Sequence, residues 1–162
     1  MHLESLEPIA APKRPSAIHP FPHFYRALSS AEPEGELVLG STGLEPIAVM
    51  PPAEFGGPGD AWSPETLLVG ALSTCFVLTF RGIARARRMS WLSLDCAVEG
   101  MLSREQGKSR FTDYTLRARL RIPEGTDPDV AERALENAEQ GCLITSSLNG
   151  RCHLETSVES VS

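Results

Sequence analysis

The four cysteines are the residues of this 162-residue chain best suited to chemistry. A cysteine reacts as its thiolate, and free backbone N–H groups at the start of a helix stabilise that form. Cys142 directly follows Gly141 and opens a predicted helical turn to Leu148, so we expect these N–H groups to lower its pKa. Cys75 lies within a long apolar helix and would be inert unless it lines a pocket. Spacing alone gives two candidate redox thiols and no reaction.

The other two cysteines, Cys96 and Cys152, each fall on the apolar face of a predicted strand, where we expect them to pack as small hydrophobic residues. A metal site is not expected. Cys152 and His153 point to opposite sides of a strand. His19 and His23 are four residues apart, but the prolines between them prevent the helix that would align them. The chain has no Cys-x2-Cys pair.

Composition narrows the class of protein. The chain is long enough for one domain with a substantial core, and 41% of its residues are apolar. A net charge of −6 argues against a nucleic-acid partner. No apolar run is expected to be long and clean enough to cross a membrane, and we see no secretory signal. Four cysteines are too few for a disulfide scaffold in a chain of this size, so without a secretory signal we expect catalytic or redox thiols. We therefore predict a cytoplasmic protein.

A long apolar helix is the element around which the chain is organised. Ser63 is expected to cap it, and Pro64 suits the first helical position. Glu65 then lies beside the positive end of the helix dipole. Apolar and small residues follow as far as Phe80, and arginines begin at Arg81. A helix that is apolar all round is buried in a core or between subunits.

The remaining segments predict an α+β fold. Residues 1–20 read as a loosely held arm rich in proline, followed by a single domain over residues 21–162. The predicted elements after the arm are strands at 23–29, 36–40 and 44–50, the long helix, a hairpin of strands at 92–98 and 114–122 with its turn at 106–108, a helix at 127–141, a short helical segment at 142–148 and a strand at 152–158.

Two motifs resemble the osmotically induced protein C (OsmC) and organic hydroperoxide resistance (Ohr) family. They are Ser63-Pro64-Glu65 through Cys75-Phe76, and Gly141-Cys142 through Leu148-Asn149-Gly150. The family has a glutamate ten residues before a first cysteine in a long helix, and a second cysteine just before the final strand. Over roughly residues 35–160 the resemblance implies an OsmC-like fold of order βββ-α-ββ-α-β, with a long buried central helix, antiparallel sheets and an intertwined homodimer.

The resemblance also implies a reaction, that of a peroxiredoxin-like organic hydroperoxide reductase without a cofactor. Cys75 would attack the peroxide O–O bond and become a sulfenic acid. Cys142 would condense with it to a Cys75–Cys142 disulfide, which a dithiol such as a lipoyl group would reduce. Glu65 would orient an arginine that stabilises the Cys75 thiolate.

One position departs from the family pattern. The family's arginine lies in the first hairpin, where this chain has Pro33 between Glu32 and Glu34. Arg26 could take that role if the hairpin is rearranged. The proline usual after the second cysteine is Leu143 here. Two alternatives therefore stand beside the peroxidase: an OsmC-fold dimer that binds a small molecule or senses redox state without efficient turnover, and a dimer whose cysteines are simply packed.

Overall fold

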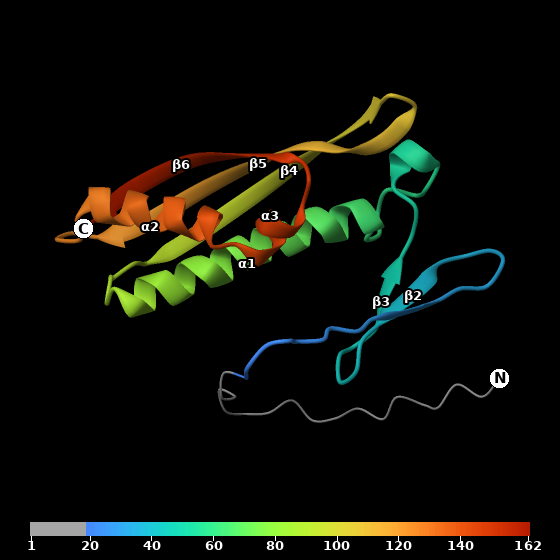
Figure 1. Cartoon of the computed structure of the whole chain (residues 1–162), viewed down its shortest axis with the longest axis horizontal. Coiled ribbons are helices and arrows are strands. Elements are labelled where there is room, and N and C mark those ends of the chain that lie inside the picture. Colours follow the sequence, from blue (N-terminus) through green and yellow to red (C-terminus); the bar gives the residue numbers. More distant parts are fainter. Residues whose placement is uncertain (1–18) are drawn as a thin grey trace. The chain divides into compact units, whose positions relative to one another are not determined.

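The computed structural model describes residues 19–162, so most of the predicted arm over residues 1–20 lies outside the described residues. Three strands, a long helix, two strands, two helices and a last strand follow in order, which confirms the α+β class and the predicted element order (Figure 1). The chain divides into two compact units, Met1–Thr66 and Leu67–Ser162. A single domain over residues 21–162 stays a prediction.

The first unit holds a small antiparallel sheet of order β1-β2-β3. Its strands are β1 (Leu28–Ser30), β2 (Leu37–Gly40) and β3 (Ile47–Val49), followed by the short 3-10 helix η1 (Ala53–Phe55). The strand predicted at 23–29 is wrong over its first five residues, because the short β2 offers backbone partners only to residues 28–30. The third strand begins just after Pro46, whose missing N–H makes it unsuited to a ladder.

Helix α1 (Pro64–Ala86) begins as the sequence predicts. The Ser63 hydroxyl accepts from the Thr66 N–H at 3.2 Å, and the Thr66 hydroxyl accepts from the Ser63 N–H at 2.8 Å. This reciprocal pair satisfies two amides that the first turn would otherwise leave free. The helix stops before Arg88, which adopts a left-handed backbone with φ of 52°.

One stripe of α1 is buried, and its other faces are not. The buried side chains are Leu72, Phe76, Phe80 and Ala84. In the most apolar 18-residue window, of mean hydropathy 1.8, only 22% of residues are buried. By length and composition α1 could cross a membrane, so the expectation that no run is long and clean enough was wrong. The same properties mark the core helix of a soluble protein, and the buried stripe is typical of that class.

The second unit is built on a three-stranded sheet of order β4-β5-β6. Strands β4 (Ser93–Glu105) and β5 (Lys108–Pro123) form the predicted hairpin, with Gln106 and Gly107 at positive φ in the turn. Strand β6 (Arg151–Val161) pairs with β5 in parallel, so the expectation of wholly antiparallel sheets is wrong for this ladder. The helical crossover from β5 to β6 is what lets the two strands run in the same direction.

Helices α2 (Pro128–Gln140) and α3 (Leu143–Ser147) form that crossover. Asp127 caps α2 as predicted, because its carboxylate accepts from the Asp129 N–H at 2.9 Å. Alternate residues of β5 lie in one core with the buried stripe of α1 and with four side chains of α2: Ala131, Ala134, Leu135 and Ala138. This core holds α3, α1 and the start of β6 together (Figure 1).

Candidate active site

The Cys75 sulfur, on α1, lies against the first turn of α3. Burial raises the pKa of Cys75, but several hydrogen-bond donors to the thiolate outweigh it: the Ile144 N–H, the Cys142 thiol, the Leu143 N–H and the Thr79 hydroxyl. Thr79 contributes least, since its single proton also bonds the Cys75 carbonyl oxygen at 2.8 Å. The pKa of Cys75 therefore lies below its usual range.

Cys142 has the opposite character. It is fully buried, and burial is the main cause of its raised pKa. Nearby Cys75 raises that pKa further, while Thr145 opposes the shift. The prediction that the helix start would lower the pKa of Cys142 was wrong. Of the N–H groups in the first turn of α3, those of Leu143 and Ile144 lower the pKa of Cys75, whereas that of Thr145 acts on Cys142 and is outweighed by burial.

The structure therefore brings together the two thiols that the sequence singled out. Each of the two thiols shifts the pKa of the other, and both are free thiols in the structure. A low-pKa thiolate next to a protonated thiol can form a sulfenic acid that its neighbour then resolves. The sequence could not show that the α3 amides point at Cys75, because that depends on how the crossover packs on α1.

Cys96 and Cys152 pack against the hydrophobic core, as predicted. Burial is the main cause that raises the pKa of each. Cys96 lies on β4, where the Ser73 hydroxyl donates to its carbonyl oxygen at 2.7 Å. Within residues 19–162, no group of three or more His, Cys, Asp or Glu side chains is arranged to hold a metal ion.

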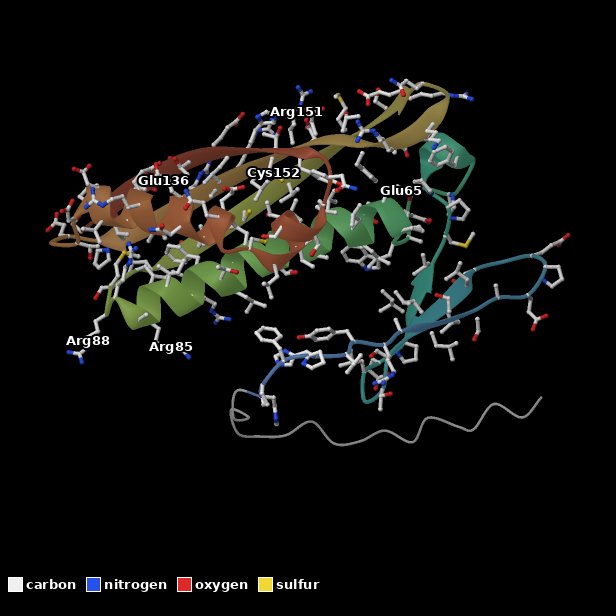
Figure 2. The ribbon with its side chains drawn as sticks, in the orientation of Figure 1. Glu65, Arg85, Arg88, Glu136, Arg151 and Cys152 are labelled. Carbon is white, nitrogen blue, oxygen red and sulfur yellow. The ribbon has the colours of Figure 1, made fainter. Side chains whose placement is uncertain are left out.

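Glu65 lies in the first turn of α1, at the other end of the segment that leads to Cys75 (Figure 2). Ten residues of continuous helix separate the two, about 15 Å at the rise of an α-helix. One carboxylate oxygen of Glu65, Oε2, is buried and has no hydrogen-bond partner in the described part of the chain. Buried acceptors are normally satisfied, so this oxygen is suited to a donor that residues 19–162 do not supply.

Arg26 precedes β1 in the first unit. Its guanidinium carbon lies 5.9 Å from the centre of the Phe24 ring, and its carbonyl oxygen accepts from the Ser41 hydroxyl at 2.9 Å. Its role beside Cys75 stays a prediction, as does the catalytic role of Glu65. Among the described groups that shift the pKa of Cys75, none is a guanidinium.

Comparison with known proteins agrees with the fold. The family model described as OsmC-like protein matches residues 57–157, more than half of the chain. The uncharacterized protein YmaD of Bacillus subtilis (strain 168) is 21% identical over 136 residues, which cover 82% of this chain and 91% of that protein.

Solved structures show the same fold. An OsmC-like protein of unknown function from Vibrio cholerae superposes with a TM-score of 0.77 at 20% identity, covering 84% of this chain and all of that one. An organic hydroperoxide resistance protein OsmC from Legionella pneumophila gives 0.67 at 23% identity, covering 85% and 97%. These identities support the fold alone, and the family model carries the assignment: the chain belongs to the OsmC-like protein family.

Proposed function

We propose that this protein is a thiol-dependent peroxidase that reduces organic hydroperoxides through Cys75 and Cys142. The observation that carries the proposal is the surroundings of the Cys75 sulfur, where two backbone N–H groups and the Cys142 thiol stabilise the thiolate. Membership of the OsmC-like family, and the name of the Legionella protein, support the same reaction class.

The two thiols divide the reaction by their protonation. The Cys75 thiolate attacks one peroxide oxygen, the O–O bond breaks, and the leaving alkoxide takes a proton to become an alcohol. Cys142, whose pKa is raised, stays a thiol and does not compete for the peroxide. It then attacks the Cys75 sulfenic acid, releasing water and forming the Cys75–Cys142 disulfide. A dithiol reductant restores both thiols by exchange.

The proposed enzyme is a homodimer. Leu78, on the side of α1 away from the buried stripe, is 61% exposed in the single chain. Only 22% of the most apolar window of α1 is buried in the single chain, and an apolar helix surface left open in this way is typical of one that a partner covers. A second copy would also be a source for the donor that Glu65 Oε2 lacks.

The second candidate function is an OsmC-fold dimer that binds a small molecule or senses redox state without efficient turnover. It is favoured by the absence of a guanidinium among the described groups around the Cys75 sulfur. An arginine would add a full positive charge that neutral N–H groups do not match, and it would polarise the peroxide.

Turnover with two peroxides separates the candidates. The assay follows consumption of cumene hydroperoxide and of hydrogen peroxide with dihydrolipoamide as reductant, in the wild type, Cys75→Ser and the matched control Cys96→Ser. The peroxidase predicts turnover that prefers the organic peroxide, is lost in Cys75→Ser and is kept in Cys96→Ser. Wild-type rates no faster than those of Cys75→Ser would contradict it and leave the binding or sensing function.

A further inference from the structure

The outer face of the β4-β5-β6 sheet carries ordered charged side chains that have no part in the proposed mechanism. Helices α1, α2 and α3 pack against the inner face, where the core lies (Figure 1). On the outer face, Arg117, Arg119 and Arg121 occupy alternate positions of β5, the central strand, and all are exposed. The two ladders place one residue of β4 and one of β6 directly beside each arginine. The partners of each guanidinium can therefore be compared at equivalent positions.

The first and the last of these arginines have carboxylate partners on the sheet. The Nε atom of Arg117 lies 3.0 Å from a carboxylate oxygen of Glu155, and its Nη1 atom lies 3.7 Å from one of Glu99. The Nε atom of Arg121 lies 3.7 Å from a carboxylate oxygen of Glu159. Both guanidinium groups are therefore neutralised by their neighbours.

Arg119, between them, is different. Its direct neighbours are Asp95 on β4 and Ser157 on β6. Within residues 19–162, neither Arg119 nor Asp95 belongs to an ion pair, although the two residues are directly opposite each other. Opposite Cβ atoms of an antiparallel pair are only about 5 Å apart, so the missing contact means that the two side chains diverge. One positive and one negative charge are thus left side by side and uncommitted.

A cavity of about 520 Å³ lies at this point of the outer face. Residues of all three strands line it, among them Asp95, Arg119 and Ser157. Ala97, the next residue of β4 on this face, also lines it, and its small side chain leaves room beside the longer ones. Such a volume is within the range of sites that bind small molecules.

We propose that this cavity binds a small zwitterion of the α-amino acid class. The Arg119 guanidinium presents a planar fork of N–H donors, which matches a carboxylate in two parallel hydrogen bonds. The Asp95 carboxylate accepts from the ammonium group of the same ligand. The Ser157 hydroxyl, on the other side of Arg119, can donate or accept a further bond.

A ligand of one charge fits the cavity less well. A simple anion bound to Arg119 meets the nearby Asp95 carboxylate, and a simple cation bound to Asp95 meets the guanidinium, so each is repelled by one wall. Arg117 and Glu155 also line the cavity, but they neutralise each other and favour neither sign. Because Arg119 and Asp95 are exposed, water competes for both charges and the affinity should be modest.

The test is an NMR titration of the wild-type protein with glycine, acetate and methylammonium at millimolar concentrations, followed by amide chemical shifts. Glycine should give saturable shifts confined to the strands around Arg119. Acetate and methylammonium each lack one charged group and should bind at least about tenfold more weakly. Glycine shifts that do not saturate, or an acetate affinity equal to that of glycine, would overturn the proposal.

Variants locate the binding. Arg119→Gln and Asp95→Asn should each weaken glycine binding about tenfold or more. The matched control is Arg110→Gln, which removes an exposed arginine of the same strand beside Glu105, away from the cavity. It should keep the wild-type affinity. All three substitutions are at exposed side chains, and near-UV circular dichroism checks that each variant is folded. Equal glycine affinity in Arg119→Gln and the control would show binding elsewhere and overturn the proposal.

The cavity and the proposed peroxidase lie on opposite faces of the sheet and are tested independently. Cys75→Ser, in which turnover is expected to be lost, should bind glycine as the wild type does. Arg119→Gln should in turn keep the wild-type rate with cumene hydroperoxide. Loss of glycine binding in Cys75→Ser would place the ligand at the thiols and contradict a site on the outer face.

Discussion

The two faces of the β4-β5-β6 sheet differ in how they control charge. On the inner face, four buried or partly buried thiols meet apolar side chains and a few neutral donors, and the pKa of every one is shifted. On the outer face, arginines and carboxylates pair across strands, with Arg117 3.0 Å from Glu155 and Arg151 2.8 Å from Asp113. Figure 2 shows Arg151 and Cys152, neighbours in sequence, labelled near the start of β6.

The two faces differ in their exposure to water. An exposed ion pair such as Arg117–Glu155 is screened by water and contributes little to stability, whereas the Asp113 side chain is only 14% exposed. On the inner face, water is largely excluded, so two N–H groups and a thiol suffice to favour one thiolate over its neighbour. The comparison indicates that the reactive group of this protein lies on the face of the sheet where charged groups are few. Each prediction below tests it, from the largest expected effect to the smallest.

Phe76→Ala should be the most damaging change. Phe76 is fully buried on α1, next in sequence to the reactive thiol, and truncating a buried phenylalanine costs about 3–5 kcal/mol. Urea unfolding measures it, with the exposed Leu78→Ala as the control on the opposite side of the helix. In the proposed homodimer, Leu78→Ala lowers the midpoint only in a way that depends on protein concentration. Equal, concentration-independent losses in both variants would contradict the contrast.

Gly150→Ala should disturb the entry to β6. A Cβ atom there would lie 2.6 Å from Cε2 of the buried Tyr114, so the ring or the strand must shift. Overpacking of this kind costs about 1–3 kcal/mol. Gly40→Ala is the control, because its Cβ would meet no atom within 4 Å. Gly150→Ala should have a lower urea midpoint than Gly40→Ala. Equal midpoints would show that the Tyr114 ring moves aside without a cost in stability.

Leu143→Pro should raise the pKa of Cys75. Proline is tolerated at the first position of α3 but has no N–H to donate to the thiolate. Losing this hydrogen bond to the thiolate removes one of the causes that lower the pKa of Cys75. The measurement is the pH midpoint of Cys75 alkylation, with Leu143→Ala, which keeps the N–H, as the control. An unchanged midpoint in the proline variant would show that this amide does not act on Cys75.

Asp113→Asn should matter less and in a pH-dependent way. Arg151, Thr112 and His153 hold the pKa of Asp113 at about 2, below its ordinary 3.8. A lowered carboxylate pKa adds stability that is fully present above about 4 and disappears as the pH falls towards 2. Wild type should therefore exceed the variant in urea midpoint near neutral pH, and the difference should shrink steadily as the pH falls from about 4 through 2. A difference in urea midpoint that does not change with pH would show that the substitution acts through packing instead of charge.

Glu155→Gln should have the smallest effect. Both side chains of the Arg117–Glu155 pair are at least half exposed, at 50% and 61%. Exposed pairs of this kind contribute about 0–1 kcal/mol, and added salt weakens them. A loss of stability well above that range, unaffected by salt, would show that the outer face is less solvated than the structure indicates.

Much of the fold could be predicted because its signals are local. Ser63 with Pro64 and Asp127 with Pro128 are helix starts that need no tertiary information. The alternation of β5 likewise sets which side chains face the core. The parallel β5–β6 ladder could not be read in this way, since alternation shows which face is buried and not the direction of the partner strand.

The sequence singled out the two candidate redox thiols but could not give their electrostatics. Cys75 and Cys142 were singled out from helix context and family resemblance, and in the structure each thiol shifts the pKa of the other. The expected lowering of the Cys142 pKa was wrong, because burial outweighs the Thr145 N–H and the Leu143 and Ile144 N–H groups act on Cys75. The sequence shows where a helix begins and not what lies opposite its first turn.

The most direct test of the account is the pH dependence of alkylation at each cysteine of the wild-type protein, resolved by mass spectrometry. Midpoints are compared instead of rates, because exposure changes rates but not the pH at which a thiolate forms. The account predicts that Cys75 has the lowest midpoint, below the usual range of a thiol, while Cys142, Cys96 and Cys152 lie above that range. A Cys75 midpoint at or above that of Cys142 would contradict the claim that the start of α3 serves Cys75.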